Sequence, residues 1–323
     1  MRLYTIVRPS GEHAVCAEFG EGLLLDLRRA DEIRSGAARP QLRCMQALIE
    51  AGDAGLDAAR TLLLDIAEEA VVKLDGARLL APLPVPVRLR DSGMFIEHLE
   101  PARRAMMRLA FRRHPDPDAA VAAALHNDPG LPEIISRRVL YYNGNHHAVI
   151  GPDAVVGWPA DSEVLDYELE MAVVVGRAAS NIDLQQAKAC VFGYTLMNDW
   201  SARDIQVDTS RGGVGPCMGK DFATSLGPCI VTADEIGDPH DIALSAWIDG
   251  ERWSSGSTRN MQHSFPEALS QLSRVSPLVP GEVIGTGTCL GGSAVEQNRR
   301  LARGQTVELR ADGIGTLRNR IED

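Results

Sequence analysis

The chain is poor in lysine. Of its 33 basic residues, only Lys73, Lys188 and Lys220 are lysines, so arginine supplies nearly all of the positive charge. The two side chains are not equivalent, because a lysine ammonium is compact and its pKa responds readily to its surroundings. A lysine kept in such a chain can therefore mark a special role, although at least two of the three are expected to be ordinary surface residues.

The chain also lacks the cysteine pairs that hold zinc or form a disulfide framework. Its six cysteines are scattered, and no two of them form a Cys-x-x-Cys pair. The first residues, "MRLYTIVRPSGEHAV", have no apolar segment of the kind found in signal peptides. We therefore expect free thiols and a cytoplasmic location.

Long apolar runs and basic stripes are missing as well. No stretch of the chain approaches the roughly 20 apolar residues of a membrane span, so no membrane partner is expected. The net charge of −11 argues against nucleic acid as a partner, because no basic surface is available to neutralise phosphates. With 323 residues, 45% of them hydrophobic, the chain can bury a substantial core.

Residues 1–85 are expected to form a small N-terminal domain of α/β type. Strand patterns occur at 2–7, 13–19, 22–28 and 77–83, and helical patterns at 41–52 and 56–70. The proline-rich segment "APLPVPVRLR" at 81–90 then marks a boundary, because proline disrupts helices and central strands alike.

Residues 86–323 are expected to form a second, strand-rich domain without internal repeats. A helix is predicted at 92–113, and the segment 114–138, rich in Pro, Asp and Gly, is predicted to be a long surface excursion or lid. Short strands and helices then mix irregularly, which indicates an α+β fold rather than regular βαβ units. The predicted strands lie at 139–144, 168–176, 227–232, 242–250, 282–288 and 306–311, and the helices at 183–190, 199–207 and 263–273.

The segment "DYELEMAVVVGR", residues 166–177, places three acids at alternate positions. Asp166, Glu168 and Glu170 precede a wholly apolar run, so the pattern predicts a strand that starts half exposed and ends buried. Alternate residues of a strand share one face. The three carboxylates would therefore repel one another unless they face water or share a cation.

Two further segments carry polar side chains at suggestive spacings. In "MNDWSARDIQ" (197–206), Ser201 and Asp204 have the form of a capping box, so that Asp199, Arg203 and Gln206 would lie near one helix face. A surface ion pair would explain the same pattern. In "MGKDFATSLGPCIVT" (218–232), Lys220 follows a glycine but lacks the full phosphate-loop pattern, and an exposed turn is the alternative.

A histidine and a glycine-rich stretch complete the candidates. In "RDSGMFIEHLE" (90–100), two helical turns would bring Asp91 and His98 to the same side. A surface or capping histidine is the more common explanation of such a pattern. The stretch "IGTGTCLGG" (284–292) could bring backbone amides to a ligand.

Taken together, these motifs resemble the fumarylacetoacetate hydrolase family. The resemblance covers roughly residues 86–300 and depends on "DYELEMAVVVGR", "GYTLMNDWSARDIQ", "GKDFATSLGPCIVT" and "GTGT". It implies a strand-rich mixed β-roll, with residues 1–85 as the variable N-terminal unit, and it implies a homodimer.

The resemblance also implies a divalent cation, Mg²⁺ or Mn²⁺ and possibly Ca²⁺. The ligands would be Glu168, Glu170, Asp199 and Asp91, and oxygen donors of this kind suit a hard cation. Asp166 is not among them, and we expect it to be solvated or structural. Four carboxylates and one dication leave a charge of −2, which Lys220 and Arg203 would balance.

By the same resemblance, His98 would activate water and Lys220 would stabilise an enolate. Glu296 matches the glutamate that orients the base, with Glu97 and Glu100 as local alternatives. The residues expected to contact substrate are Arg203, Gln206, Tyr142 and Thr286.

The expected activity is metal-dependent cleavage of a C–C bond in a 2,4-dioxo acid, such as an acylpyruvate. The substrate partner is thus a small 2-oxo acid. A 2-oxo-alkenoate hydratase, an isomerase or an oxaloacetate decarboxylase on the same fold is the alternative. Phosphoryl transfer would need a phosphate-cradling loop that the sequence lacks. A protein that binds metal and oxo acid without turnover would retain the ligands but needs neither Lys220 nor His98.

Overall fold

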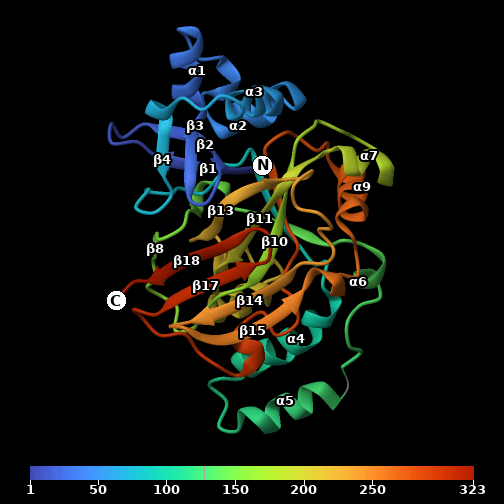
Figure 1. Cartoon of the computed structure of the whole chain (residues 1–323). Coiled ribbons are helices and arrows are strands. Elements are labelled where there is room, and N and C mark those ends of the chain that lie inside the picture. Colours follow the sequence, from blue (N-terminus) through green and yellow to red (C-terminus); the bar gives the residue numbers. More distant parts are fainter. Residues whose placement is uncertain (127) are drawn as a thin grey trace.

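Two β-sheets that pack face to face form the centre of the molecule (Figure 1), and the predicted α+β class is confirmed. The structure is a computed structural model, and it describes residues 1–126 and 128–323. In Figure 1 the N-terminal elements lie at the top and helices α4 and α5 at the bottom.

The larger sheet contains the strands that carry the candidate site. Within the described residues its order is β4-β3-β2-β1-β13-β11-β10-β16-β5-β6, with β7 beside β13. Its members are β1 (Arg2–Val7), β2 (His13–Phe19), β3 (Leu23–Asp26), β4 (Val71–Lys73), β5 (Arg88–Ser92), β6 (Tyr141–Gly144), β7 (Val149–Ile150), β10 (Leu169–Val175), β11 (Val191–Asp199), β13 (Thr224–Thr232) and β16 (Glu282–Gly285).

The smaller sheet covers one face of the larger. Its order in the described part of the chain is β15-β14-β17-β18-β8, and a separate strand pair, β9 with β12, lies beside the site. The bounds are β8 (Val155–Val156), β9 (Leu165–Asp166), β12 (Ser201–Ala202), β14 (Ala243–Ile248), β15 (Glu251–Ser257), β17 (Thr306–Ala311) and β18 (Gly315–Ile321).

Helices pack around the two sheets. The α-helices are α1 (Leu27–Ser35), α2 (Met45–Glu50), α3 (Asp53–Leu63), α4 (Ile96–Ala110), α5 (Pro117–His126), α6 (Ile134–Arg137), α7 (Leu184–Ala189), α8 (Arg203–Ser210) and α9 (Phe265–Val275). The short 3₁₀ helices are η1 (Pro40–Leu42), η2 (Glu68–Ala70), η3 (His146–Ala148), η4 (Cys217–Gly219), η5 (Thr258–Asn260) and η6 (Val295–Gln297). None of the helices in the described residues is long and apolar enough to cross a membrane.

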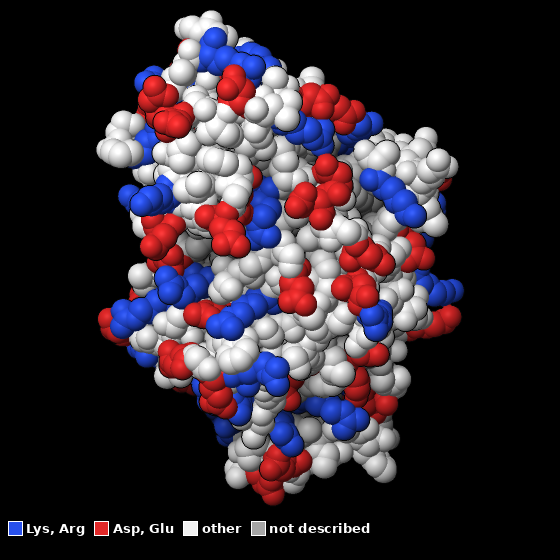
Figure 2. All heavy atoms as spheres, viewed as in Figure 1, with Lys and Arg blue, Asp and Glu red and all other residues white. Residues whose placement is uncertain are grey.

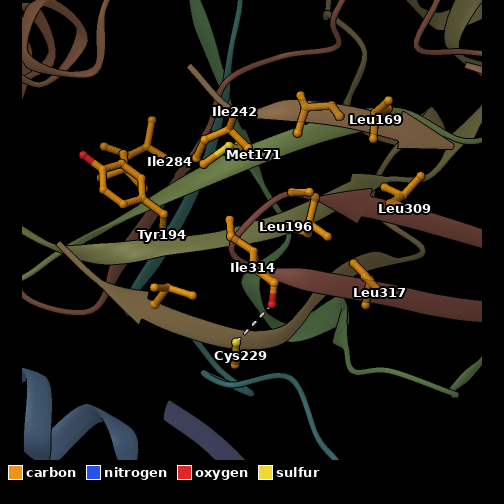
Figure 3. Packing of buried hydrophobic residues seen from close by; sticks show 14 of the residues in the cluster. Leu169, Met171, Tyr194, Leu196, Cys229, Ile242, Ile284, Leu309, Ile314 and Leu317 are labelled. Atoms are coloured by element: carbon orange, nitrogen blue, oxygen red, sulfur yellow. Dashed lines mark hydrogen bonds between the residues drawn. The ribbon is translucent and has the colours of Figure 1, made fainter. Parts of the chain in front are cut away.

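The core follows from strand alternation. Along β10, Met171 and Val173 point into the layer between the sheets, while Ala172 and Val174 pack on the opposite face, where α1–α3 lie. Both faces of β10 are therefore apolar, which explains its unbroken apolar run. Figure 3 shows the inter-sheet layer, where Leu309 and Leu317 of the smaller sheet meet Leu196 of the larger.

Residues 1–85 join the larger sheet through backbone pairing. Strand β1 pairs antiparallel with β13, with Arg2 opposite Val231 and Leu3 opposite Ile230. Its alternation sends Tyr4 and Ile6 to the inter-sheet core and Leu3 to the core beneath the helices. The first 85 residues thus extend the sheet on which the candidate site is built, and their independence as a domain stays a prediction.

One strand predicted in this part of the chain was wrong, and another was predicted too long. The strand expected at 77–83 is reduced to one isolated bridge, Ile6 with Leu79, because Pro82 and the prolines that follow it offer no backbone N–H donors. The strand expected at 22–28 ends at Asp26. The Asp26 carboxylate accepts a hydrogen bond from the Arg29 backbone N–H and caps helix α1.

The surface carries charges of both signs in close mixture. On the face shown in Figure 2, basic and acidic side chains alternate over both sheets, without a large area of one sign. Arginines in and just after α4 are also paired with acids: Arg104 pairs with Glu100, and Arg112 pairs with Asp208.

Candidate active site

Four carboxylates from β5, β10, β11 and the residue position just before β10 meet on the face of the larger sheet that points away from the smaller sheet. Each offers an oxygen within 4.8 Å of the others. Glu170 lies in β10, Asp199 ends β11, Asp91 lies in β5, and Glu168 comes just before β10. These are Asp91, Glu168, Glu170 and Asp199, the four residues that the family resemblance implies as metal ligands. Sheet pairing thus gathers groups that are far apart in sequence.

The acidic strand is buried from its start, contrary to the half-exposed start that was predicted. Asp166 and Glu170 are 0% exposed and Glu168 is 5% exposed. Asp166 is not solvated: it accepts hydrogen bonds from Arg203 Nε and the Ala294 backbone N–H. Of the two expectations for Asp166, the structural one therefore holds.

Two buried cations balance one side of the cluster. Lys220 Nζ lies 2.5 Å from Glu168 Oε2 and 2.6 Å from Asp199 Oδ2, and Arg203 lies 2.8 Å from Glu168 Oε1. Burial alone would raise the pKa of Glu168, but the charges of Arg203 and Lys220 lower it below its usual value. Lys73 and Lys188 are exposed, so Lys220 is the lysine with a special environment.

The other side of the cluster has an excess of negative charge. Burial and the Asp199 charge raise the pKa of Asp91 to about 7, and burial and the Asp91 charge raise the pKa of Glu170 well above its usual value. Asp91 Oδ1 is buried and has no hydrogen-bond partner among the described residues. Clustered, uncompensated carboxylate oxygens are the donor set that a hard divalent cation requires. The residues present therefore fit a metal site.

The glycines of "GTGT" make room for the cluster. A Cβ on Gly285 would lie 2.8 Å from both Asp91 Oδ1 and Glu170 Oε2. The Gly287 backbone N–H donates to Glu170 Oε2 at 3.0 Å, and Gly287 has φ +74°. The backbone amide of this stretch thus binds a site carboxylate instead of pointing at a ligand.

Gly285→Ala is expected to weaken Mn²⁺ binding at least about tenfold, since displacing supporting groups around metal ligands costs that much. The methyl group would push apart the Asp91 and Glu170 oxygens. Titration with Mn²⁺ followed by electron paramagnetic resonance measures the effect. Gly157→Ala is the control, because its Cβ would meet only Glu322 Oε2, at 3.8 Å. Equal Mn²⁺ affinity in both variants would contradict the packing argument.

His98 and Glu296 form a pair beside the cluster. His98, on α4, is 7% exposed, and its Nδ1 lies 2.9 Å from Glu296 Oε2. Glu296 is held in turn by the Gly291 and Ser293 backbone N–H groups. The two alternatives for this partner do not reach His98: Glu97 is exposed, and Glu100 binds Arg103 and Arg104.

Asp91 and His98 belong to different elements, whereas the prediction placed them on one helix. Asp91 lies in strand β5, and α4 begins only at Ile96. The two residues therefore do not share a helix face. The turn between strand and helix brings both to the same cavity.

The helix predicted at 199–207 begins later, at Arg203, with Ala202 as its N-cap. Asp199 still belongs to β11, and the Ser201 hydroxyl donates to the Asp199 carbonyl, so the capping box and the shared face were wrong. Pairing of Ser201 with Asp166 in β12–β9 holds the chain extended here. Arg203 and Gln206 do lie together, with Arg203 Nη1 3.2 Å from Gln206 Oε1.

Asp204 instead anchors α8 to the segment before β9. It accepts hydrogen bonds from the Ser162 hydroxyl and the Glu163 backbone N–H, both at 2.7 Å. Asp204→Ala is expected to lower the free energy of unfolding by about 1–3 kcal/mol, because it leaves buried donors without a partner. Urea denaturation tests this prediction. Asp208→Ala is the control, because Asp208 lies on the same helix and its ion pair with Arg112 is exposed. This change should lower the free energy of unfolding by at most about 1 kcal/mol.

A cavity of about 480 Å³ opens beside the carboxylate cluster. Asp91, Glu168, Lys220, Arg203 and Gln206 line its inner part, together with His98 and Tyr142. The Tyr142 hydroxyl donates to Asp199. This volume is typical of sites for small organic ligands.

Thr286, predicted to contact substrate, does not line this cavity. It is fully buried, and its hydroxyl donates to the Gly287 carbonyl. Gly287 and Thr288 line the cavity in its place. Substrate contact by Thr286 stays a prediction. Thr288 was not among the predicted substrate contacts, although it is the second threonine of "GTGT".

The profile for the C-terminal part of fumarylacetoacetate (FAA) hydrolase matches residues 118–322. The chain belongs to the fumarylacetoacetate hydrolase family. The predicted family and its strand-rich β-roll are thereby confirmed. The match begins after Asp91 and His98, so the placement of these two residues depends on the structure.

Among relatives in this family, the mitochondrial oxaloacetate tautomerase FAHD2B of Bos taurus is 34% identical over 177 residues. These residues are 54% of this chain and 56% of the tautomerase. The chain covers 60–63% of several Burkholderia relatives and 75% of an uncharacterized Pyrococcus abyssi protein.

Solved structures of the family share the fold over the whole chain. The fumarylacetoacetate hydrolase of Exiguobacterium antarcticum superposes with a TM-score of 0.73 at 24% identity, covering 100% of this chain and 99% of that one. Maleylpyruvate hydrolase of Sphingobium sp. SYK-6, solved with manganese(II) and pyruvate, gives a TM-score of 0.70 at 20% identity, with 100% and 99% coverage. These likenesses establish the fold.

Proposed function

We propose that this protein is a metal-dependent hydrolase that cleaves the C–C bond of a 2,4-dioxo acid of the acylpyruvate class. The observation that carries the proposal is the His98–Glu296 pair, in which His98 lines the same cavity as Asp91 and Glu168 of the carboxylate cluster. A base, a partner that orients it and a cation site in one cavity are the parts that such a hydrolysis needs.

The carboxylates Asp91, Glu168, Glu170 and Asp199 would hold Mg²⁺ or Mn²⁺, with Ca²⁺ as another candidate. The bound cation would supply Lewis acidity towards the 2-oxo acid group and would hold that group in place. The manganese and pyruvate in the Sphingobium maleylpyruvate hydrolase support this choice of ligand class.

His98 would take a proton from water, and the resulting hydroxide would add to the distal carbonyl. With Nδ1 next to Glu296, Nε2 is the nitrogen free to accept this proton. Glu296 would stabilise the imidazolium that forms. Collapse of the adduct would break the C–C bond and release a carboxylic acid and the enolate of a 2-oxo acid, which then takes up a proton.

Lys220 and Arg203 would act by charge. Both are almost fully buried, and the neighbouring carboxylates raise the pKa of each despite the opposing effect of burial. Both therefore remain cationic. A fixed ammonium next to the developing enolate lowers the energy of the transition state more than that of the neutral substrate.

A tautomerase, hydratase or decarboxylase acting on the same 2-oxo acid group is the second candidate. It is favoured by the 34% identity to the oxaloacetate tautomerase. Such enzymes need proton transfer at a substrate carbon, which His98 or Lys220 would supply. A tautomerase or decarboxylase needs no attacking water, and a hydratase adds water to a C=C bond instead of a carbonyl group.

A panel of substrates separates the two candidates. Chelator-treated protein with Mg²⁺ or Mn²⁺ restored is mixed with acetylpyruvate, fumarylpyruvate, oxaloacetate or a 2-hydroxy-2,4-dienoate. Pyruvate release is followed for the first three and absorbance for the dienoate and for the enol of oxaloacetate. Metal-dependent release of pyruvate from an acylpyruvate supports hydrolysis. Consumption of oxaloacetate or dienoate alone would replace hydrolysis by the second candidate.

A further inference from the structure

The cavity beside the carboxylate cluster has two chemically different parts. The inner part carries the acids and the buried cations. The outer part is an apolar wall, formed by Leu99, Ala102 and Met106 of α4, by Leu131 and Ile135, and by Leu140. The three α4 residues are spaced i, i+3 and i+7, which places them on one face of the helix.

The apolar wall has no buried cation that is free to bind a second carboxylate among the described lining residues. Arg103 is the nearest candidate on α4, but it already pairs with Glu100 and with Asp128. Arg138 also borders the cavity, but it is exposed to solvent. An anionic group pressed against this wall would lose its hydration without gaining a buried partner.

We infer that the group carried by the 2-oxo acid at this site is apolar and uncharged, such as an alkyl or aryl chain. The inference rests on the proposed function, because it places the 2-oxo acid group at the carboxylate cluster and the remainder of the substrate along the wall. Each methylene buried there contributes about 0.8 kcal/mol, or roughly a fourfold gain in affinity. The preferred substrates are then acylpyruvates with an apolar acyl group.

Binding of simple 2-oxo acids tests the inference without requiring turnover. Calorimetry with Mg²⁺-loaded protein would compare pyruvate, 2-oxohexanoate and 2-oxooctanoate, and then 2-oxosuberate, which has the length of 2-oxooctanoate and a carboxylate at its end. We expect affinity to rise up to about fourfold per methylene and to fall again for 2-oxosuberate. A flat series, or tighter binding of 2-oxosuberate than of 2-oxooctanoate, would overturn the inference.

Two variants locate the effect on the wall. Ala102→Phe fills the space next to the wall and should abolish the gain from the longer chain while pyruvate still binds. Ala123→Phe, the same change at an exposed position of α5, is the matched control and should behave as wild type. Ile135→Arg, at a half-buried position of α6, should favour 2-oxosuberate over 2-oxooctanoate. If Ala102→Phe and Ile135→Arg both kept the wild-type preference, the chain would not lie along this wall.

The affinity series and the cleavage assay test the apolar chain and the proposed hydrolysis separately. Cleavage of acetylpyruvate depends on the inner part of the cavity, and the affinity series depends on the wall. Cleavage with a flat affinity series would reject the apolar chain alone. A rising series without cleavage of any acylpyruvate would reject hydrolysis and retain the apolar chain.

Discussion

Glu170→Gln protein is expected to unfold at a higher temperature than wild type when metal is absent, and to bind Mn²⁺ far more weakly. Glu170 is fully buried and has no cationic partner within residues 1–126 and 128–323. Its hydrogen bonds come from the Gly287 backbone N–H and the Thr288 hydroxyl. Glutamine keeps the shape and one carbonyl acceptor but removes a negative charge that faces Asp91 and Glu168. Repulsion among the remaining acids therefore falls.

The loss of Mn²⁺ affinity should exceed the roughly 10–100-fold that changes around metal ligands cause, because the variant removes a ligand itself. Differential scanning calorimetry with chelator and Mn²⁺ titration measure the two effects. A rise in unfolding temperature together with a loss of Mn²⁺ affinity distinguishes a metal ligand from an ordinary buried acid. Loss of an ordinary buried acid would lower the unfolding temperature and leave the Mn²⁺ affinity unchanged. Glu163→Gln, at an exposed position, is the control. Unchanged Mn²⁺ affinity in Glu170→Gln would remove Glu170 from the ligand set.

His98→Gln is expected to lower kcat about 10²–10⁴-fold, the range that a general base contributes, while Mn²⁺ affinity stays within twofold or so of wild type. His98 borders the cavity and pairs with Glu296, but it is not part of the carboxylate cluster. The substitution therefore removes proton transfer without removing a ligand. Steady-state kinetics on the acylpyruvate that the wild type cleaves measures the loss.

Glu296 should act through His98, and so it is a positioning residue. Glu296→Gln is expected to give a smaller loss of kcat than His98→Gln and little further loss when the two changes are combined, because residues that act as a unit are not additive. Glu97→Gln, on the exposed side of the same helix, should leave kcat and its pH profile unchanged. Full turnover by His98→Gln would mean that another group activates water.

Much of the site could be predicted because it is carried by short local motifs. Glu168 and Glu170 share a strand face by alternation alone, and Lys220 stood out because the chain has only three lysines. The same local reasoning failed where tertiary contacts determined the backbone conformation. Ser201 satisfies the rule for a helix cap, but its backbone pairs with Asp166 in a two-stranded sheet, so α8 begins at Arg203 instead.

Burial could not be read from the acidic strand. An alternation of acids and apolar residues predicts one solvated face, yet Asp166, Glu168 and Glu170 are all buried. The reason lies far away in sequence: Arg203 pairs with Asp166 and Glu168, and the Ala294 backbone N–H binds Asp166. Only the tertiary fold brings these partners to the strand and makes burial of its charges tolerable.

By itself, then, the sequence determined the α+β class through its irregular mixture of strand and helix patterns. Its local motifs also carried the resemblance that implied the family and the four acids able to share a cation. The tertiary structure alone decided that β5, β10 and β11 bring those acids within reach of one another, that Glu296 lies against His98, and that an apolar wall continues the cavity. Such contacts join residues up to 198 positions apart, His98 and Glu296 being that pair. No local pattern specifies them, because the pairing of strands and the docking of α4 follow from the packing of the whole core.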